Sequence, residues 1–352
     1  MDIVKKYCFI LLFTFSQLPL IAQNDTLVLK NSNDFQQFVN SNIHPKVLIF
    51  QEGNYFLDRP IFFENDIEII GRSDRGVIIQ ATKEMNYFFR AKSSINLQNV
   101  ILDGDKLVPY GIMAFGDVFM DNSTVKNLFG NRKLSGIGIR SNSSNRKITI
   151  RNSNFENITG FEDGIEGNSV GAHRGLFLKG GDIIIDRCKF LNILGEEDSD
   201  SIQIQDDKNS KSKTVISNCI FENFGKRAIK ISIPNNVIKN NFFYNTNDSC
   251  YVVIGLIGSS YNFVYDNFFD AHVKLAFVSM SNSKGIDIKN NLIKANFSEE
   301  NANVFYIKNV ENLNVFDNVI EMKKPLINKL IRNRNKRNVE LFIDSDQIKY
   351  VN

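Results

Sequence analysis

The chain has 352 residues and is 43% hydrophobic, which is enough to bury a sizeable core in one to three domains. Its formal net charge of +3 offers no strong electrostatic attraction, so we expect no nucleic-acid partner. Aromatic content comes from 30 Phe and 10 Tyr, with no Trp.

The first residues have the pattern of a secretory signal peptide. Lys5 and Lys6 precede the apolar run "YCFILLFTF", and "LIAQ" offers a cleavage point after Ala22. The run is too short to cross a membrane as a helix, and no later segment has the apolar length of a membrane helix. We therefore predict a signal peptide over 1–22, no membrane span, and secretion or a periplasmic location in a bacterium.

A short amphipathic segment follows the signal peptide. "NDFQQFVNSN" places Phe35, Phe38 and Val39 on one side of a helix. Such a helix suits the open end of a stack of strands, which would otherwise expose unpaired strand edges. We predict an N-terminal cap over about 31–42.

One short pattern then recurs along the chain. It reads "RNSNF", "DRCKF", "SNCIF", "KNNFF", "YDNFF", "KNNLI" and "FDNVI", with steps of 35, 31, 22, 26, 24 and 27 residues. A second alternating strand follows each copy, as in "RGLFLKG", "DSIQIQD" and "RAIKISI". Repeats of this size with two or three strands and turn residues between them predict a β-solenoid.

Stacked turns place equivalent residues above one another, about 4.8 Å apart. We expect an internal aromatic stack, an internal step from Cys188 to Cys219, and a set of turn residues that tolerate left-handed geometry. The stack comprises Phe155, Phe190, Phe221, Phe243 and Phe269, and the turn residues are Asn152, Asn218, Asn240 and Asn290. With Cys250, the mature chain keeps an odd number of cysteines at wide spacing, which indicates neither a disulfide scaffold nor a CxxC metal site.

The first turns resemble a known fold family. "KVLIFQEGNYFLDRPIFFENDIEIIGRSDRGVIIQ" is similar to the start of pectin-lyase-like right-handed parallel β-helix proteins, with apolar strands around Gly53-Asn54-Tyr55 and an Ile-Ile-Gly end at 69–71. The resemblance implies an all-β, single-domain β-helix over 23–352. We expect a C-terminal cap over about 321–352, and a monomer.

The outward side of the second strand carries polar groups in the middle turns. Counting alternate residues outward gives Gly138 and Arg140, Phe177 and Lys179, Gln203 and Gln205, Lys230 and Ser232, Val253 and Gly255, Val278 and Met280, and Tyr306 and Lys308. The connections "GFEDGIEGNSVGAHRG" and "GEEDSD" are long beside these turns, and long loops that flank a sheet build cleft walls. An ordinary solvated face with decorated loops remains the alternative.

An extended groove of mixed charge suits a polysaccharide. No Gly-rich phosphate loop, Ser/His/Asp set or zinc-ligand spacing is present. Elimination on a uronate polymer needs a cation that neutralises the substrate carboxylate and a base that removes the neighbouring proton. The candidate catalytic residues are Lys230, Arg227, Lys179 and Asp200; the candidate substrate-binding residues are Arg174, Gln203, Gln205, His173 and Arg140.

Two further possibilities concern carboxylates. Asp198 and Glu166 are the candidate ligands of a calcium ion, so we expect either no cofactor or calcium. A hydrolase would need two carboxylates across a glycosidic bond, and such a pair would have to come from different turns, for example Asp200 with Asp163 or Glu166.

The central turns are similar to those of the alginate lyase and chondroitinase B family. The similar stretch is "CIFENFGKRAIKISIPNNVIKNNFFYNTNDSCYVVIGLIGSSYNFVYDNFF". The places of the family's catalytic Lys and Arg read "SIPNN" and "GLIGSS" here, so neither residue is matched. We expect a secreted lyase that cleaves an acidic polysaccharide, with a glycoside hydrolase or a non-catalytic carbohydrate-binding or adhesion protein as alternatives.

Overall fold

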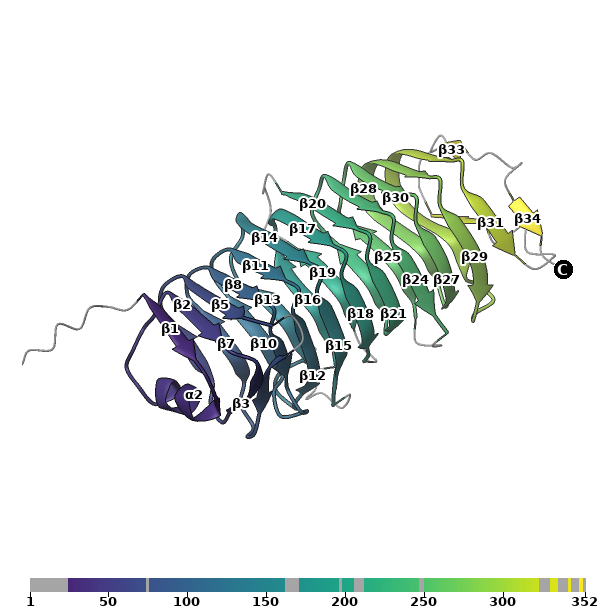
Figure 1. Ribbon diagram of the computed structural model, residues 1–352. Helices are drawn as coiled ribbons and strands as arrows, with labels where there is room; N and C mark the ends of the chain where they lie inside the picture. The colour runs from purple at the N-terminus through teal and green to yellow at the C-terminus, as the bar shows by residue number, and fades with distance from the viewer. Residues whose placement is uncertain are drawn as a thin grey trace, which may run out of the picture.

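The computed structural model describes residues 25–73, 76–161, 171–195, 198–205, 212–246, 250–322, 330–334, 341–342 and 348–350. Parallel strands coil into one rod of about ten turns, with a single short helix near the N-terminal end of the described chain (Figure 1). The predicted parallel β-solenoid is confirmed. Within the described ranges, no helix is long and apolar enough to cross a membrane.

Each complete turn contributes strands to three faces, which we call A, B and C. Face A contains β4 (Ile61–Phe63), β7 (Tyr87–Ala91), β10 (Tyr110–Ala114), β13 (Ile137–Ser141), β16 (Arg174–Lys179), β19 (Asp200–Gln205), β22 (Arg227–Ile231), β25 (Val252–Ile257) and β32 (Ile331–Asn333). Face B contains β1 (Thr26–Leu29), β2 (Val47–Phe50), β5 (Ile67–Gly71), β8 (Ile95–Gln98), β11 (Val118–Asp121), β14 (Arg146–Arg151), β17 (Gly181–Asp186), β20 (Lys213–Ser217), β23 (Asn236–Lys239), β26 (Asn262–Tyr265) and β33 (Leu341–Phe342). Face C contains β3 (Gly53–Leu57), β6 (Val77–Ala81), β9 (Ile101–Asp103), β12 (Thr124–Gly130), β15 (Asn154–Gly160), β18 (Lys189–Ile193), β21 (Ile220–Phe224), β24 (Phe242–Asn245), β27 (Phe268–Val273), β29 (Leu292–Phe297), β31 (Val319–Met322) and β34 (Ile348–Tyr350). Two long strands, β28 (Ala276–Lys289) and β30 (Asn303–Phe316), run through faces A and B and join them into one sheet.

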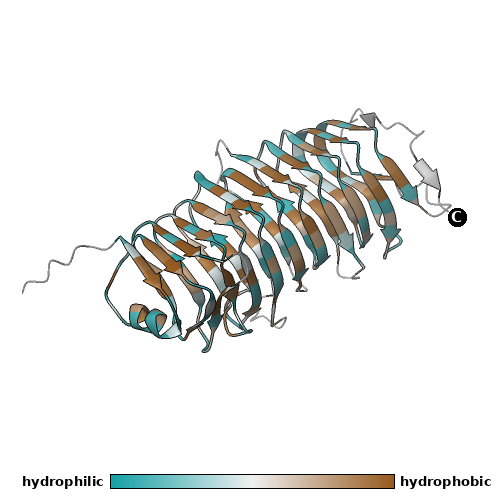
Figure 2. Cartoon of the chain, viewed as in Figure 1, coloured by the Kyte–Doolittle hydropathy of each residue, from teal (hydrophilic) through white to brown (hydrophobic). Residues whose placement is uncertain are grey.

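The interior is built from residues in the same place on successive turns. Hydropathy alternates along the strands, so apolar side chains meet inside the rod (Figure 2). The five predicted phenylalanines are fully buried and form one stack, with neighbouring ring centroids 4.8–5.1 Å apart. Parallel ring stacking at this spacing follows from the in-register strand pairs of β15, β18, β21, β24 and β27.

Turn residues behave as the sequence predicts. Asn152, Asn218, Asn240 and Asn290 all adopt left-handed backbone conformations, with φ between 48° and 57°. Asparagine tolerates this region because its short amide can bond to nearby backbone groups. These residues turn the chain from face B to face C.

A polar ladder that was not predicted lies just inside these turns. Asn241, Asn267, Asn291 and Asn318 are buried, and each accepts the backbone N–H of the equivalent residue one turn earlier at 2.9–3.1 Å. The predicted step from Cys188 to Cys219 continues this ladder, because the Cys188 N–H donates to Cys219 Sγ at 3.4 Å. The ladder satisfies turn N–H groups that burial would otherwise leave unpaired.

Helix α2 (Ser32–Val39) covers the first edge of face C, as predicted for the N-terminal cap. Phe35 and Phe38 are buried beneath it. Ser32 Oγ accepts the Phe56 N–H of β3 at 3.1 Å, and the Gln36 amide donates to the Phe56 carbonyl. The helix therefore satisfies backbone groups that an open edge would expose. Most of the predicted C-terminal cap lies outside the described residues.

Strict alternation fails at one place in most face A strands, which corrects part of the sequence prediction. Ala228 and Ile229 are both buried, and so are Phe277 and Val278. Two consecutive inward residues shift the alternation by one. The prediction that Gly138, Val253, Val278 and Met280 face outward is therefore wrong: the last three are buried, and a Cβ on Gly138 would lie 2.7 Å from the Phe155 ring.

Removing one ring from the internal stack should destabilise the rod strongly. We expect Phe221→Ala to lower the free energy of unfolding by about 3–5 kcal/mol, because it leaves a cavity between two rings. Phe242→Ala is the matched control, since Phe242 also stacks on a neighbouring ring but is 40% exposed, and it should cost about 1 kcal/mol or less. Chemical denaturation of the two variants measures the difference, and equal losses would contradict an internal stack.

Candidate functional site

Strand register gathers the predicted site residues on face A. Across neighbouring strands, Arg140 pairs with Phe177, Phe177 with Gln203, and Gln203 with Lys230. A second row pairs Arg174 with Asp200 and Asp200 with Arg227. Lys179 pairs with Gln205. We call the region of face A formed by these residues, Asp198 and Lys226 the basic strip.

Five charged side chains from two neighbouring turns form a cluster within this strip. Asp198 Oδ1 accepts from Lys226 Nζ at 3.1 Å and from Arg227 Nη2 at 2.5 Å, while Asp198 Oδ2 accepts from Lys230 Nζ at 3.1 Å. Arg227 Nε donates to Asp200 Oδ1 at 2.6 Å. Arg227 therefore bridges the two carboxylates. The cluster unites residues that lie 27 to 32 positions apart in sequence.

Asp198 and Asp200 have opposite environments although they are two residues apart. The Asp200 side chain is fully buried, and burial raises the pKa of its carboxyl against the attraction of Arg227. Asp198 is 39% exposed; burial opposes its ionisation, but Arg227 and Lys230 hold the pKa of its carboxyl well below its usual range. Asp200 Oδ2 has no hydrogen-bond partner among the described residues. A buried charge cluster of this kind is costly and is typical of functional sites.

A cation–aromatic stack extends the strip toward the N-terminal end. The Arg140 guanidinium lies 5.8 Å from the Tyr110 ring centroid and 5.5 Å from that of Phe177. The Arg174 guanidinium also contacts the Phe177 ring, 4.9 Å from its centroid. Arg140 also donates to Tyr110 Oη at 3.1 Å and to Asn142 Oδ1 at 2.9 Å. These contacts fix the direction of two long cationic side chains.

The two glutamines connect this stack to the charge cluster. Arg174 Nε donates to Gln203 Oε1 at 2.5 Å, and Gln203 Nε2 donates to Gln205 Oε1 at 3.0 Å. Arg174 also donates to the carbonyl of Ala172 at 2.6 Å. Phe177 and then Gln203 therefore lie between Arg140 and Lys230 on this row.

His173 does not belong to the surface, contrary to the predicted substrate contact. Its side chain is buried, and Nδ1 accepts the Gly136 N–H at 2.8 Å. Burial, and to a smaller extent Arg174, lower its pKa to about 4, so the imidazole is neutral at pH 7. A Cβ on Gly130 or Gly160 would lie within 2.7 Å of the ring, so both glycines make room for it. His173 has a structural role here.

The calcium site stays a prediction, because one of its two ligands, Glu166, lies outside the described residues, as does Asp163, the predicted hydrolase partner of Asp200. Both oxygens of Asp198 already bond to cationic side chains. Among the residues described, no group of three His, Cys, Asp or Glu side chains could hold a metal ion.

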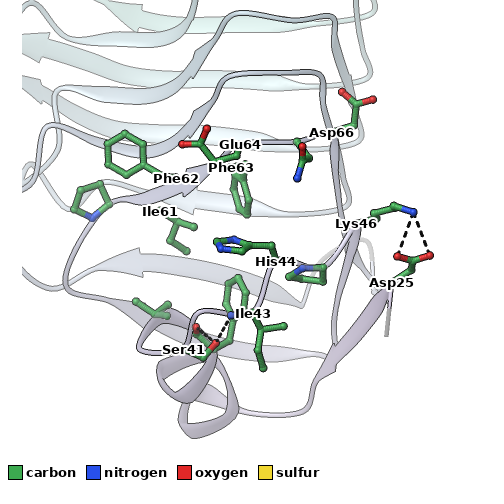
Figure 3. A pocket seen from close by; sticks show the side chains of 15 residues that line it. Asp25, Ser41, Ile43, His44, Lys46, Ile61, Phe62, Phe63, Glu64 and Asp66 are labelled. Carbon is green, nitrogen blue, oxygen red and sulfur yellow. Dashed lines mark hydrogen bonds and ion pairs between the residues drawn. The ribbon is translucent and has the colours of Figure 1, made fainter. Parts of the chain in front are cut away.

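A separate pocket of about 200 Å³ lies at the N-terminal end of the rod, away from the basic strip. Figure 3 shows His44, Ile61 and Phe63 around it, with Phe62 and Glu64 along one side. Its carboxylates already have partners: Asp25 pairs with Lys46 at 3.2 Å, and Glu64 with a lysine on the next turn. This pocket contains none of the predicted site residues.

Two contributors to the strip escaped the sequence analysis. Tyr110 pairs with Ile137, which pairs with Arg174, so it occupies the same row as Asp200. The repeat register would have found it. Lys226 was not among the predicted site residues, yet it donates to Asp198. The strip can neutralise anions and hydrogen-bond sugar hydroxyls, while Lys230 could act as a base only after leaving Asp198.

The lowered pKa of Asp198 predicts a pH-dependent contribution to stability. A depressed folded-state pKa stabilises the protein above the unfolded value of 3.8, and this contribution disappears as the pH falls through the folded value. We expect Asp198→Asn to be less stable than the natural chain at neutral pH. The difference should shrink as the pH falls below 3.8, because the natural carboxylate then becomes protonated. Thermal unfolding across this pH range measures the difference, and a constant difference would contradict the ion-pair cluster.

Comparisons with known proteins found one family model and several similar structures. Residues 174–339 match the family model described as a right handed beta helix region. The Dettilon tailspike protein is similar in structure with a TM-score of 0.53 at 10% identity, over 89% of this chain and 68% of the tailspike. A mannuronic acid specific polysaccharide family 6 lyase from human gut microbiota aligns with a TM-score of 0.49 at 14% identity, over 93% of this chain and 90% of the lyase. PfbA, a surface adhesin of Streptococcus pneumoniae, aligns with a TM-score of 0.49 at 13% identity, over 88% of each chain.

A search of curated proteins gave no match. At these identities the structural likeness concerns the fold alone. The fold expected from the pectin-lyase-like resemblance is confirmed. The chain therefore folds as a right-handed parallel β-helix, and its residues 174–339 are similar to the right handed beta helix region family.

Proposed function

We propose that this protein is exported and binds an acidic polysaccharide along the basic strip of face A. One observation carries the proposal: the described residues of the strip include six cationic side chains and two carboxylates. The cations are Arg140, Arg174, Lys179, Lys226, Arg227 and Lys230, and the carboxylates are Asp198 and Asp200.

The spacing of the strip favours a polymer over a small ligand. Arg140 and Lys230 lie three strands apart on the same row, which corresponds to about 14 Å at the usual strand spacing. Phe177 and Gln203 occupy the places between them. A chain of several sugar rings can therefore contact two cations, an aromatic ring and an amide at once.

The ion pair between Asp198 and Lys230 explains how the strip would accept an anion. Asp198 is 39% exposed and holds Lys230 at 3.1 Å. A sugar carboxylate that approaches the strip can take the place of Asp198 as the partner of Lys230. Until then the ion pair keeps Lys230 in position without leaving its charge uncompensated.

Cleavage by β-elimination is a second candidate, favoured by the opposed pKa shifts of Asp198 and Asp200 within one cluster. In that reaction a base removes the proton next to the substrate carboxylate and the glycosidic oxygen leaves. Arg227 would neutralise the carboxylate. Lys230 would serve as the base in its neutral form, after the substrate has displaced Asp198 and the ammonium has lost a proton to water.

Binding to a panel of uronate polymers tests the proposal. We expect Lys230→Ala and Arg140→Ala each to weaken binding about 10- to 100-fold, because each loses a charged contact, and we expect added salt to weaken binding further. Isothermal titration calorimetry gives the affinities. Absorbance of unsaturated sugar ends in the same mixtures reports whether the polymer is also cleaved.

Lys308→Ala is the matched control, since Lys308 is an exposed lysine three strands beyond the turn of Lys230 on the same face. It removes the same charge and should leave affinity unchanged. Equal losses of affinity for Lys308→Ala and Lys230→Ala would show that only the net charge of the protein matters, and would contradict specific binding along the basic strip. Binding without unsaturated ends would reject the elimination reaction and keep the binding function.

A further inference from the structure

Face B carries a shallow groove of about 470 Å³ that the basic strip does not include. It crosses the strands β5, β8, β11 and β14 near the N-terminal end of the rod. Its lining comprises Lys46, Val47, Asp66, Ile67, Glu68, Ser94, Ile95, Asn96, Asp117, Val118, Phe119, Lys147 and Thr149. The groove therefore combines one aromatic ring with amide, hydroxyl and carboxylate groups.

Register places the central groups of the groove in one row. Glu68 pairs with Asn96, Asn96 with Phe119, and Phe119 with Thr149. Successive members of this row are about 4.8 Å apart. A planar carboxylate, a planar amide, an aromatic ring and a hydroxyl thus follow one another along the rod axis.

Hydrogen bonds fix the polar half of this row before any ligand arrives. Asn96 Nδ2 donates to Glu68 Oε1 at 2.8 Å, and Gln98 Nε2 donates to the same oxygen at 3.3 Å. Gln98 also donates to Asn96 Oδ1 at 3.2 Å. Both bonds to Glu68 end on Oε1, so Oε2 can still accept from a ligand. Side chains that are already ordered lose little conformational entropy when they bind.

The charges of the groove distinguish it from the basic strip. Its lining holds two lysines, Lys46 and Lys147, and three carboxylates, Asp66, Glu68 and Asp117. Asp66 accepts from Ser94 N and from Ser93 Oγ, and Asp117 accepts from the Lys147 N–H at 3.1 Å. An acidic polymer would meet more negative than positive charge here, so charge complementarity excludes the ligand proposed for face A.

We propose that this groove is a second binding site and that its ligand is an uncharged oligosaccharide. A sugar ring has an apolar C–H face, which Phe119 can cover, and a rim of hydroxyls that donate to Glu68 and exchange hydrogen bonds with Asn96 and Thr149. The row spans four turns, which is long enough for more than one sugar ring. The two faces then recognise glycans of different charge on one rod.

Titration of the full chain with three sets of oligosaccharides tests this site: uncharged glucose and mannose oligomers, cationic glucosamine oligomers and acidic uronate oligomers. We expect binding of at least one uncharged set, with Phe119→Ala weakening it at least tenfold. Phe263→Ala is the matched control, because Phe263 occupies the same row five strands later, outside the groove. It should bind as the natural chain does.

Three results would overturn the proposal. These are no binding of any uncharged oligomer, equal losses for Phe119→Ala and Phe263→Ala, and binding of cationic oligomers alone. Asn96→Ala should weaken binding of the same oligosaccharide, and this second variant keeps the test valid if the Phe119 variant misfolds. Circular dichroism and thermal unfolding check the folding of both variants. Lys230→Ala and Arg140→Ala should leave uncharged binding intact, so failure of the face A proposal would not affect this result.

Discussion

Parallel pairing of each turn with the next, in fixed register, is the constraint on which both the fold and the sites depend. One turn cannot bury its own apolar face, and its strands have no partners within the turn. Stacking supplies both, and it forces equivalent residues into rows: a phenylalanine row, an asparagine row and an outer polar row. A slip of one residue between turns would expose the phenylalanines and separate Asp200 from Arg227.

The same register explains how charged side chains can lie buried in face A of the rod. Asp200 is buried, yet Arg227 from the next turn donates to it and then reaches Asp198, which is partly exposed. Lys226 and Lys230 complete the neutralisation of Asp198. Each charge thus has a partner from a neighbouring turn, which limits the cost of desolvation. The arrangement leaves cationic groups ordered at the surface, where an anionic polymer can use them.

Much of the fold could be predicted from the sequence because the repeat carries it. The phenylalanine at the end of five repeat copies identified the phenylalanine row, and the preceding asparagines identified the left-handed turns. The capping helix followed from three apolar residues at helical spacing. The internal asparagine row was missed, since Asn241 and Asn267 look like ordinary turn residues and only the fold shows that they face inward.

The sequence predicts those parts of the site that depend only on strand alternation and on the register between turns. Arg140, Gln203 and Lys230 lie on one outer row as expected. In later turns the predicted outer positions were wrong, because two consecutive residues of the strand face inward and shift the alternation. His173 was misjudged because burial of a loop histidine depends on Gly130 and Gly160 from other turns. Neither the bridging role of Arg227 nor the contact of Tyr110 with Arg140 can be derived from spacing alone, since both depend on side-chain direction.

A double-mutant cycle on Asp198 and Lys230 tests the account most directly, because these residues lie 32 positions apart and meet only if the turns stack in this register. The free energies of unfolding of the natural chain, Asp198→Ala, Lys230→Ala and the double variant give the coupling. We predict a favourable coupling of about 0.5–1 kcal/mol, as expected for a partly exposed pair. Strictly additive losses would show that the two side chains do not interact, and would contradict the register and the basic strip together.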